Sequence, residues 1–347
     1  MKKSGILFIT LLLLILLLLG PLALIGGSVP LGFDEMFSAL EKLLLPVGDT
    51  TLSPTLAILR LRLLRYLLAT MVGIILGASG AVFQGLFMNP LADPYVVGTS
   101  SGAALGAVVA ITLGGFSLFS PSTEGISWFG LSGISLMAFI GGLGATILVY
   151  FIAGFFPRST SSTTVLLAGS AMGSFFSASI SILLTLKDRD LHRAFFWLLG
   201  GFSGRIWDHL GFLIVPTVLS LFIGMMGARP LDILSGGDEQ AQSLGLRPSI
   251  TRLFLSIGMA IGISAAVSVA GTIGFVGLVS PHIARRVVGP RHRIVIPSAA
   301  LVGAIMLVVA DIAARTLVPP LELPVGALTA LIGAPYFLVK LLKRTAA

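Results

Sequence analysis

Charged residues are too scarce in this chain to cover a folded protein that is surrounded by water. Only 10% of the 347 residues are Asp, Glu, Lys or Arg, while 56% are hydrophobic. Water-soluble domains carry about 25% charged residues. Inside lipid the backbone must satisfy its own hydrogen bonds, and a helix does so within one segment. The chain is therefore predicted to be an all-α, polytopic integral membrane protein.

The apolar runs are numerous enough for about ten transmembrane helices. A span needs about 20 mostly apolar residues, and one shorter run that follows a glycine-rich break is counted as a helix. No polar stretch is long enough for a separate domain, so residues 1–347 are read as one transmembrane domain. The expected spans are 5–26, 62–83, 96–114, 132–155, 164–185, 210–228, 252–270, 276–288, 295–314 and 325–342.

The first apolar run has two interpretations, a retained helix or the core of a secretory signal. The run extends from Gly5 to about Gly26. A signal core has about 7–15 apolar residues, whereas a run of this length is long enough to cross a bilayer. We expect a retained first helix.

The distribution of basic residues favours one orientation in the membrane. With ten spans and a cytoplasmic N-terminus, most Lys and Arg side chains fall on the cytoplasmic side, as the positive-inside rule requires. We expect a multi-pass protein of the cell inner membrane whose N- and C-termini are both cytoplasmic. The net charge of +8 is assigned to these loops, so no nucleic-acid partner is expected.

Two proline-containing breaks interrupt the apolar runs in corresponding places. They are "FMNPLADPYVVG" at 87–98 and "GTIGFVGLVSPHIAR" at 271–285. Proline removes a backbone donor, and broken segments persist in lipid only where protein or a wet cavity surrounds them. Such breaks in corresponding positions of two halves, here 56–185 and 250–342, indicate a transport path. Two unrelated kinks are the alternative.

The polar stretch 229–251, "ARPLDILSGGDEQAQSLGLRPSI", is longer than a connection between two spans requires. Ser235 or Asp238 is expected to cap a short helix that ends at Gly245, and Pro248 is expected to start the next element. We interpret this helix as a docking surface for a cytoplasmic partner, and a solvated loop is the alternative. No lysine follows a glycine, so the chain lacks a P-loop and any ATPase must be a separate chain.

Two ionisable residues are candidates for functional groups. Asp311 is the acid expected nearest to membrane depth, where such groups are functional candidates, and we interpret it as a structural partner for a neighbouring helix. His282 has no Cys, Asp or Glu at metal-ligand spacing and is interpreted as structural. The chain has no cysteine, and we expect no catalytic residue, metal or cofactor in it.

Long motifs extend from about Arg60 to the C-terminus. They include "RLLRYLLATMVGIILGASGAVFQGLFMNPLADPYVVGTSSGAALGA", "LDILSGGDEQAQSLGL" and "GTIGFVGLVSPHIARRVVGPRHRIVIPSAALVGA". Together they resemble the FecCD family, permease subunits of ATP-binding-cassette importers for iron–siderophore, haem and vitamin B12. The resemblance implies a type II ABC importer permease fold and a homodimer. It also implies two cytoplasmic ATPase subunits and a periplasmic or extracellular substrate-binding protein as partners.

The resemblance also implies roles for individual residues. The family's ATPase-docking loop matches Gly237, Asp238, Glu239, Gln240, Ala241, Leu244 and Gly245. The residues that match cytoplasmic gates are Asn89 and Leu91, with Thr160, Ser161 and Ser162 at a second gate.

Three arginines match family positions that bind acidic residues of the external binding protein. They are Arg62, Arg65 and Arg315. Their alternative role is to extend from a helix end toward the membrane surface. The family's usual Arg-Leu-Pro-Arg reads Arg-Leu-Leu-Arg at 62–65, which bears on where that helix begins.

The predicted function is that of a permease subunit that moves a metal chelate into the cytoplasm and is not itself an enzyme. An ion-coupled secondary transporter is one alternative, but it would need intramembrane acids, and only Asp311 qualifies. A lipid-modifying enzyme is another, but it would need clustered acids or histidines, and the four histidines are scattered.

Overall fold

The computed structural model describes residues 3–27, 29, 31–44, 53–112, 132–154 and 162–345. These residues form helices and no β-strand, as predicted. The helices in chain order are α1 (Lys3–Ile25), α2 (Phe33–Leu44), α3 (Pro54–Leu86), α4 (Thr99–Thr112), α5 (Gly133–Gly154), α6 (Ser162–Leu186), the 3₁₀ turn η2 (Asp188–Asp190), α7 (Leu191–Leu199), α8 (Trp207–Leu234), α9 (Asp238–Ser243), α10 (Pro248–Ala270), α11 (Val276–Val288), α12 (His292–Thr316) and α13 (Val325–Thr345).

Each of the ten expected spans coincides with one helix. Among the described residues, seven helices are long and apolar enough to cross a membrane, and α4 is a shorter apolar helix. The largest difference is at α3, which begins eight residues before the expected boundary, at Pro54. The Ser53 side chain accepts a hydrogen bond from the Leu56 amide, and Pro54 occupies the first turn. Residues 62–65 therefore lie inside α3, about two turns after its capped start.

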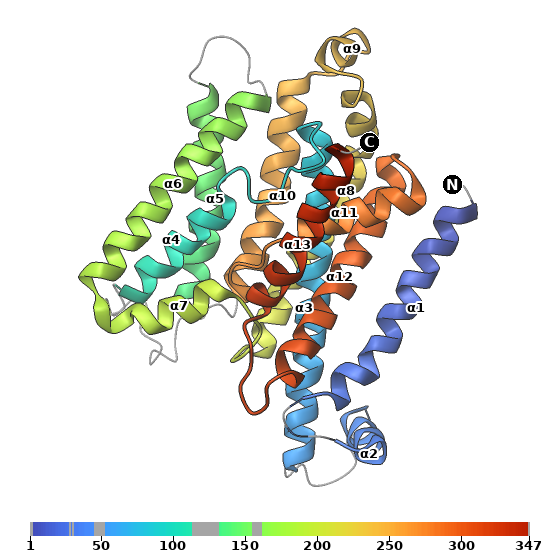
Figure 1. The fold of residues 1–347 in the computed structure, drawn as a ribbon, viewed down its shortest axis with the longest axis vertical. Coiled ribbons are helices and arrows are strands. Elements are labelled where there is room, and N and C mark those ends of the chain that lie inside the picture. The colour runs from blue at the N-terminus through green and yellow to red at the C-terminus, as the bar shows by residue number, and fades with distance from the viewer. Residues whose placement is uncertain are drawn as a thin grey trace.

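Three long helices form the centre of the molecule. The most apolar windows of α3, α10 and α12 are 72–78% buried, whereas those of α1 and α6 are only 17% buried. Figure 1 accordingly shows α3, α10 and α12 in the middle, with α1 and α6 at opposite sides. The outer helices present apolar side chains outward, as a lipid-facing surface requires.

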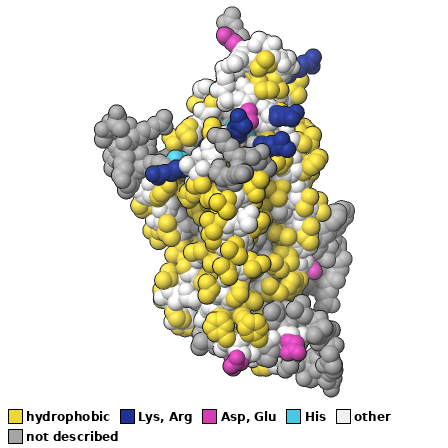
Figure 2. Space-filling model, turned by 90° about the vertical axis from the view of Figure 1, so that its right-hand side faces the viewer, with side chains coloured by type: hydrophobic (Ala, Val, Ile, Leu, Met, Phe, Trp, Pro, Cys, Tyr) yellow, Lys and Arg dark blue, Asp and Glu magenta, His cyan; other side chains and the backbone are white. Residues whose placement is uncertain are grey.

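The two ends of the molecule differ in charge. Both chain ends and α9 lie at one end, called here the α9 end, and α2 lies at the other, called the α2 end (Figure 1). Figure 2 shows Lys and Arg side chains gathered toward the α9 end, above a broad apolar surface. This distribution is the one that the positive-inside rule predicts if the α9 end is cytoplasmic.

The first and second halves of the chain pack crosswise. In the first half, α3 packs against α11 and α12, and in the second half α10 packs against α4 and α5. α3 runs from the α2 end to the α9 end, and α10 runs in the opposite direction (Figure 1). A short helix follows a break after each of them, α4 after α3 and α11 after α10. This correspondence supports the interpretation of two related halves in inverted orientation.

Glycine residues allow the backbones of the central helices to come into direct contact. A Cβ atom at Gly77 would overlap the carbonyl oxygen of Ala299 in α12, and one at Gly80 would overlap that of Gly277 in α11. Contacts of this kind give helices in lipid a large packing area without a hydrophobic driving force.

We predict that Gly77→Ala destabilises the protein by about 1–3 kcal/mol, since the added methyl group pushes α12 away from α3. Unfolding by denaturing detergent, followed by circular dichroism, measures the change. Gly144→Ala is the matched control, because nothing lies within 4 Å of a Cβ atom at that position of α5. Equal stability of the two variants would contradict the predicted contact.

Candidate functional site

The short helix α9 begins without the side-chain cap that the sequence predicted. Its N-cap is Gly237, which has a φ of 97°. The Ser235 hydroxyl donates to the Asp232 carbonyl oxygen instead, and the Asp238 carboxylate accepts hydrogen bonds from Arg252. The expected cap by Ser235 or Asp238 is therefore wrong, because both side chains have other partners.

The end of α9 follows the prediction. Gly245 has a φ of 81°, and its amide donates to the Gln242 carbonyl oxygen. The Leu246 amide donates to the Ala241 carbonyl oxygen, which completes a Schellman motif. Pro248 then begins α10, as predicted.

The docking residues expected from the sequence divide into an anchor and an exposed face. Ala241 is fully buried and holds α9 against the protein. Glu239, Gln240 and Leu244 are exposed, with Leu244 at 63%. An isolated apolar side chain beside charged and polar groups is a suitable surface for a protein partner.

Arg252 connects α9 with the end of α3. This side chain is 1% exposed and makes a two-pronged ion pair with Asp238, at 2.8 Å and 2.5 Å. Its Nε also donates to the carbonyl oxygen of Leu86, the last residue of α3, at 3.2 Å. The hydrogen bonds from Arg252 hold the pKa of Asp238 below its usual range. The ion pair therefore persists at neutral pH, and α9 is attached to the residue that precedes the first break.

A second network reaches α3 from α11 and α12. The backbone amide and Nδ1 of His292 both contact the Asp232 carboxylate, at 3.0 Å and 2.7 Å. Arg285 contacts His292 Nε2 at 3.4 Å and donates to the Ala81 carbonyl oxygen at 3.2 Å. Two arginines from the second half of the chain thus bind backbone carbonyls near the end of α3.

The first break uses its polar residues to form turns. The Asn89 side chain accepts a hydrogen bond from the Leu91 amide at 2.9 Å, and the Asp93 side chain accepts one from the Tyr95 amide at 2.9 Å. Asn and Asp form such turns without help from other segments. Leu91 is 42% exposed, so it projects from the break.

The two breaks contact each other. The Tyr95 hydroxyl donates to the carbonyl oxygen of Ile273, in the second break, at 2.9 Å. A Cβ atom at Gly277 would overlap the ring of Pro94. The breaks therefore lie against protein, as broken segments at membrane depth must. Of the second expected gate, Ser162 begins α6, while Thr160 and Ser161 lie outside the described residues.

Arg62 and Arg315, expected at a docking surface, are buried against the end of α1. Their exposed fractions are 6% and 3%. Arg62 donates to the carbonyl oxygens of Leu24 and Ile25 at 2.9 Å and 2.8 Å, and Arg315 donates to that of Gly26 at 2.9 Å. A helix C-terminus carries partial negative charge and unpaired carbonyls, which these guanidinium groups satisfy.

Arg65 lies between two acids. It binds Asp311 at 2.8 Å and Glu322 at 2.7 Å. Asp311 also contacts Arg315 at 3.1 Å and is 2% exposed. Asp311 therefore joins α12 to α3, in the structural role that we assigned to it. Of the three arginines expected at the docking surface, Arg65 has the partner nearest to solvent, because the Glu322 side chain is 37% exposed.

Sequence reasoning missed the residues that connect these elements. Arg252, Asp232, His292 and Arg285 form no recognised motif, since the separations between contacting residues range from 7 to 204 along the chain. In the sequence, Arg252 is an arginine near the start of a helix. Such a residue cannot be told from an ordinary positive charge in a cytoplasmic loop. Among the described residues, no group of three or more His, Asp or Glu could hold a metal ion.

Comparison with known proteins gives one consistent family. The model of the FecCD transport family matches residues 12–343. The cobalamin import system permease protein BtuC of Halobacterium salinarum is 42% identical, and the matched region covers 82% of this chain and 73% of BtuC. The hemin transport system permease protein HmuU of Yersinia pestis is 41% identical, covering 82% and 83%. A solved metal-chelate type ABC transporter in an inward-facing conformation superposes with a TM-score of 0.80, at 31% identity, covering 98% and 99%.

We predict that Asp238→Asn loosens α9, because the neutral amide keeps the shape of the carboxylate but loses its ion pair with Arg252. Amide hydrogen exchange in residues 238–246 should become faster by roughly tenfold, the size expected when a hydrogen bond to a charged group is lost. Glu239→Gln, the neighbouring exposed acid, is the control and should exchange at the original rate. Equal rates in both variants would contradict the assigned link.

We also predict that Arg62→Gln frays the last turn of α1, because the carbonyl oxygens of Leu24 and Ile25 lose their hydrogen-bond donor. Hydrogen exchange in residues 22–26 should rise by about tenfold or more. Arg60→Gln, two residues earlier on α3, removes a guanidinium that donates no hydrogen bond within the described residues, and should leave the rate unchanged. Slow exchange in Arg62→Gln would show that α1 is held by other contacts.

Proposed function

This chain belongs to the FecCD transport family, and we propose that it is the membrane-spanning permease of an importer that moves a metal chelate into the cytoplasm. Permeases of this family do not hydrolyse ATP, which is the task of a separate subunit. We further propose a homodimer that binds two ATPase subunits at the α9 end and receives its cargo from an external binding protein at the α2 end. The α9 end and both chain termini would then lie in the cytoplasm, below an inner membrane.

The link from α9 through Arg252 to Leu86 is the observation that carries this proposal. α9 is the element best suited to receive an ATPase, since it presents Glu239, Gln240 and Leu244 on a buried anchor. A displacement of α9 acts through the ion pair on the end of α3. The break at 87–98 begins at the next residue, so the same displacement moves Asn89 and Leu91, the proposed gate.

We propose that Thr160, Ser161 and Ser162 form a second gate at the start of α6. For the binding protein we propose docking around Arg65 and Glu322, with Arg62 and Arg315 as the expected partners of its acids. Because Arg62 and Arg315 are buried, we propose that they act indirectly, by fixing the end of α1 beneath the docking surface. Exposed ion pairs of this kind stabilise a complex by only about 0–1 kcal/mol and act mainly in encounter and register.

The pairing of Asp311 disfavours the ion-coupled alternative. A proton- or sodium-coupled carrier needs an intramembrane acid that gains and loses a cation. Arg65 and Arg315 already neutralise Asp311, at 2.8 Å and 3.1 Å. The exchange of ions at this carboxylate would require two guanidinium groups to leave it.

The proposal predicts that Glu239→Lys combined with Gln240→Lys abolishes uptake. Both positions are exposed on α9, so the folded chain tolerates the change while a docked ATPase meets two new positive charges. Capture of the ATPase by the purified permease, and ATP-driven uptake in proteoliposomes, measure the effect, and both should fall by at least about tenfold. Asp208→Lys, at the start of α8 near the α2 end, is the control for ATPase capture.

Two results would contradict the proposal. One is normal capture and uptake in the doubly substituted variant, which would remove α9 from the ATPase interface. The other is uphill transport by the chain alone in vesicles, without an ATPase, which would favour the ion-coupled carrier.

A further inference from the structure

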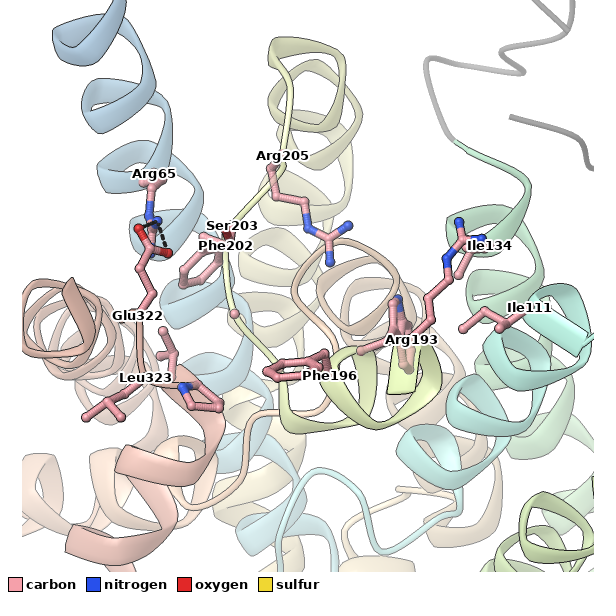
Figure 3. A pocket seen from close by; sticks show the side chains of 15 residues that line it. Arg65, Ile111, Ile134, Arg193, Phe196, Phe202, Ser203, Arg205, Glu322 and Leu323 are labelled. Carbon is pink, nitrogen blue, oxygen red and sulfur yellow. Dashed lines mark hydrogen bonds and ion pairs between the residues drawn. The ribbon is translucent and has the colours of Figure 1, made fainter. Parts of the chain in front are cut away.

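A cavity at the α2 end is lined by hydrogen-bond donors that lack acceptors. It has a volume of about 390 Å³ and lies between α7, the stretch 200–205 and the residues just before α13. Figure 3 shows Arg205 and Arg193 entering it from different segments, with Phe196 below them and the Arg65–Glu322 pair on the opposite side. Two further aromatic side chains, Trp197 and Phe202, also line the cavity.

Arg205 is a half-buried cation without a hydrogen-bond partner among the described residues. Its Nε is inaccessible to solvent and has no hydrogen-bond acceptor within the described residues. Burial lowers the pKa of Arg205 to about 10, so the guanidinium remains protonated at neutral pH. The indole Nε1 of Trp197, a second donor of the same cavity, is also buried and unpaired in the described part of the chain. Buried donors without acceptors, charged ones above all, cost free energy unless a ligand satisfies them.

The acid that lines the cavity is not free to pair with Arg205. Arg65 donates to both carboxylate oxygens of Glu322, at 2.9 Å and 2.7 Å, and also binds Asp311. Arg193 is exposed and donates no hydrogen bond within the described residues. The cavity therefore has an excess of positive charge, in contrast to the paired guanidinium groups of Arg62, Arg252 and Arg315.

We propose that this cavity binds an acidic arm of the cargo, which makes the transported chelate an anion with free carboxylate or comparable acidic groups. The inference rests on the proposed function and narrows its substrate class. A carboxylate would accept charge-assisted hydrogen bonds from Arg205 and Arg193, and the Trp197 indole would donate a third. The aromatic side chains would cover the apolar part of the arm.

The dimensions fit one arm of a large chelate. Sites for complete small molecules have volumes of about 300–1,000 Å³, and this cavity is at the lower end of that range. A second cavity of about 320 Å³ shares Arg205, Phe202 and Ser203 and continues toward the end of α1. A branched anion could therefore place two arms on either side of Arg205.

Cations and neutral chelates would be disfavoured here. A cationic chelate would meet two unpaired guanidinium groups, and a neutral one would leave Arg205 half-buried without a counter-charge. Selectivity between cargo classes would then arise from unpaired groups in the wrong complex as well as from hydrogen bonds in the right one.

Binding to the full-length chain in phosphatidylcholine nanodiscs tests the proposal without the partner subunits. Trp197 supplies the signal, because an iron chelate bound in the cavity quenches its fluorescence, and Trp197→Phe identifies that part of the signal. Ferric dicitrate is the anionic probe, and ferrioxamine, a cationic iron hydroxamate, is the comparison. We expect saturable quenching by ferric dicitrate that weakens with added salt, and little quenching by ferrioxamine.

Arg205→Gln should weaken the binding of ferric dicitrate by about tenfold or more, and Arg205→Lys should restore most of it. Arg193→Gln, at the exposed donor, should have a smaller effect. Arg189→Gln is the control, because this exposed arginine of η2 is not among the residues that line the cavity. Circular dichroism of each variant separates a lost site from a lost fold.

Three results would overturn the proposal. They are the absence of binding by ferric dicitrate, equal binding by Arg205→Gln and the unchanged chain, and equal binding of ferrioxamine. If Arg205→Gln binds ferric dicitrate normally but loses affinity for the purified binding protein, the acidic partner of Arg205 belongs to that protein and not to the cargo. If ATP-driven uptake of every chelate fails while Arg205-dependent binding persists, the proposed function fails and the site stands.

Discussion

Every backbone group freed at a helix end inside a membrane protein needs a partner from the protein, and arginine provides that partner repeatedly in this chain. Arg252 and Arg285 donate to carbonyl oxygens near the end of α3. Arg62 and Arg315 do the same at the end of α1. A backbone group that faces lipid has no water to bind, so donors from neighbouring helices stabilise these helix ends.

These contacts also join separate elements of the structure. A guanidinium group can bind a carboxylate on one helix and a backbone carbonyl on another. It then joins the two helices whatever side chains the other helix carries. Arg252 joins α9 to α3 in this way, and Tyr95 joins the first break to the second. Hydrogen bonds to the main chain therefore connect α9 with both breaks, in addition to side-chain packing.

The sequence predicted the helices well and their connections poorly. Ten expected spans coincide with helices, and seven of these were recognisable because each is a long apolar run. The end of α9 was recognisable because Gly245 adopts a backbone conformation that favours glycine. The cap of α9 was predicted wrongly, since Ser235 and Asp238 bind other residues. The roles of Arg252 and Asp238 depend on which segments meet in space, and no local pattern encodes that. The family resemblance indicated α9 as a docking site but gave no information on how it connects to the break.

The same residue type serves two purposes here, and its partners distinguish them. Arginines with a carboxylate or carbonyl at hydrogen-bond distance, such as Arg252, hold elements together. Arg205 has no such partner for its buried Nε within the described residues, and it lies in a cavity whose acid is already paired. A buried donor without a partner is a cost to folding, and a ligand that accepts its hydrogen bond would offset that cost. A transported cargo must leave the proposed site when the permease opens, so a few hydrogen bonds suffice there. This is consistent with a weak site at the entrance of the transport path rather than a high-affinity pocket.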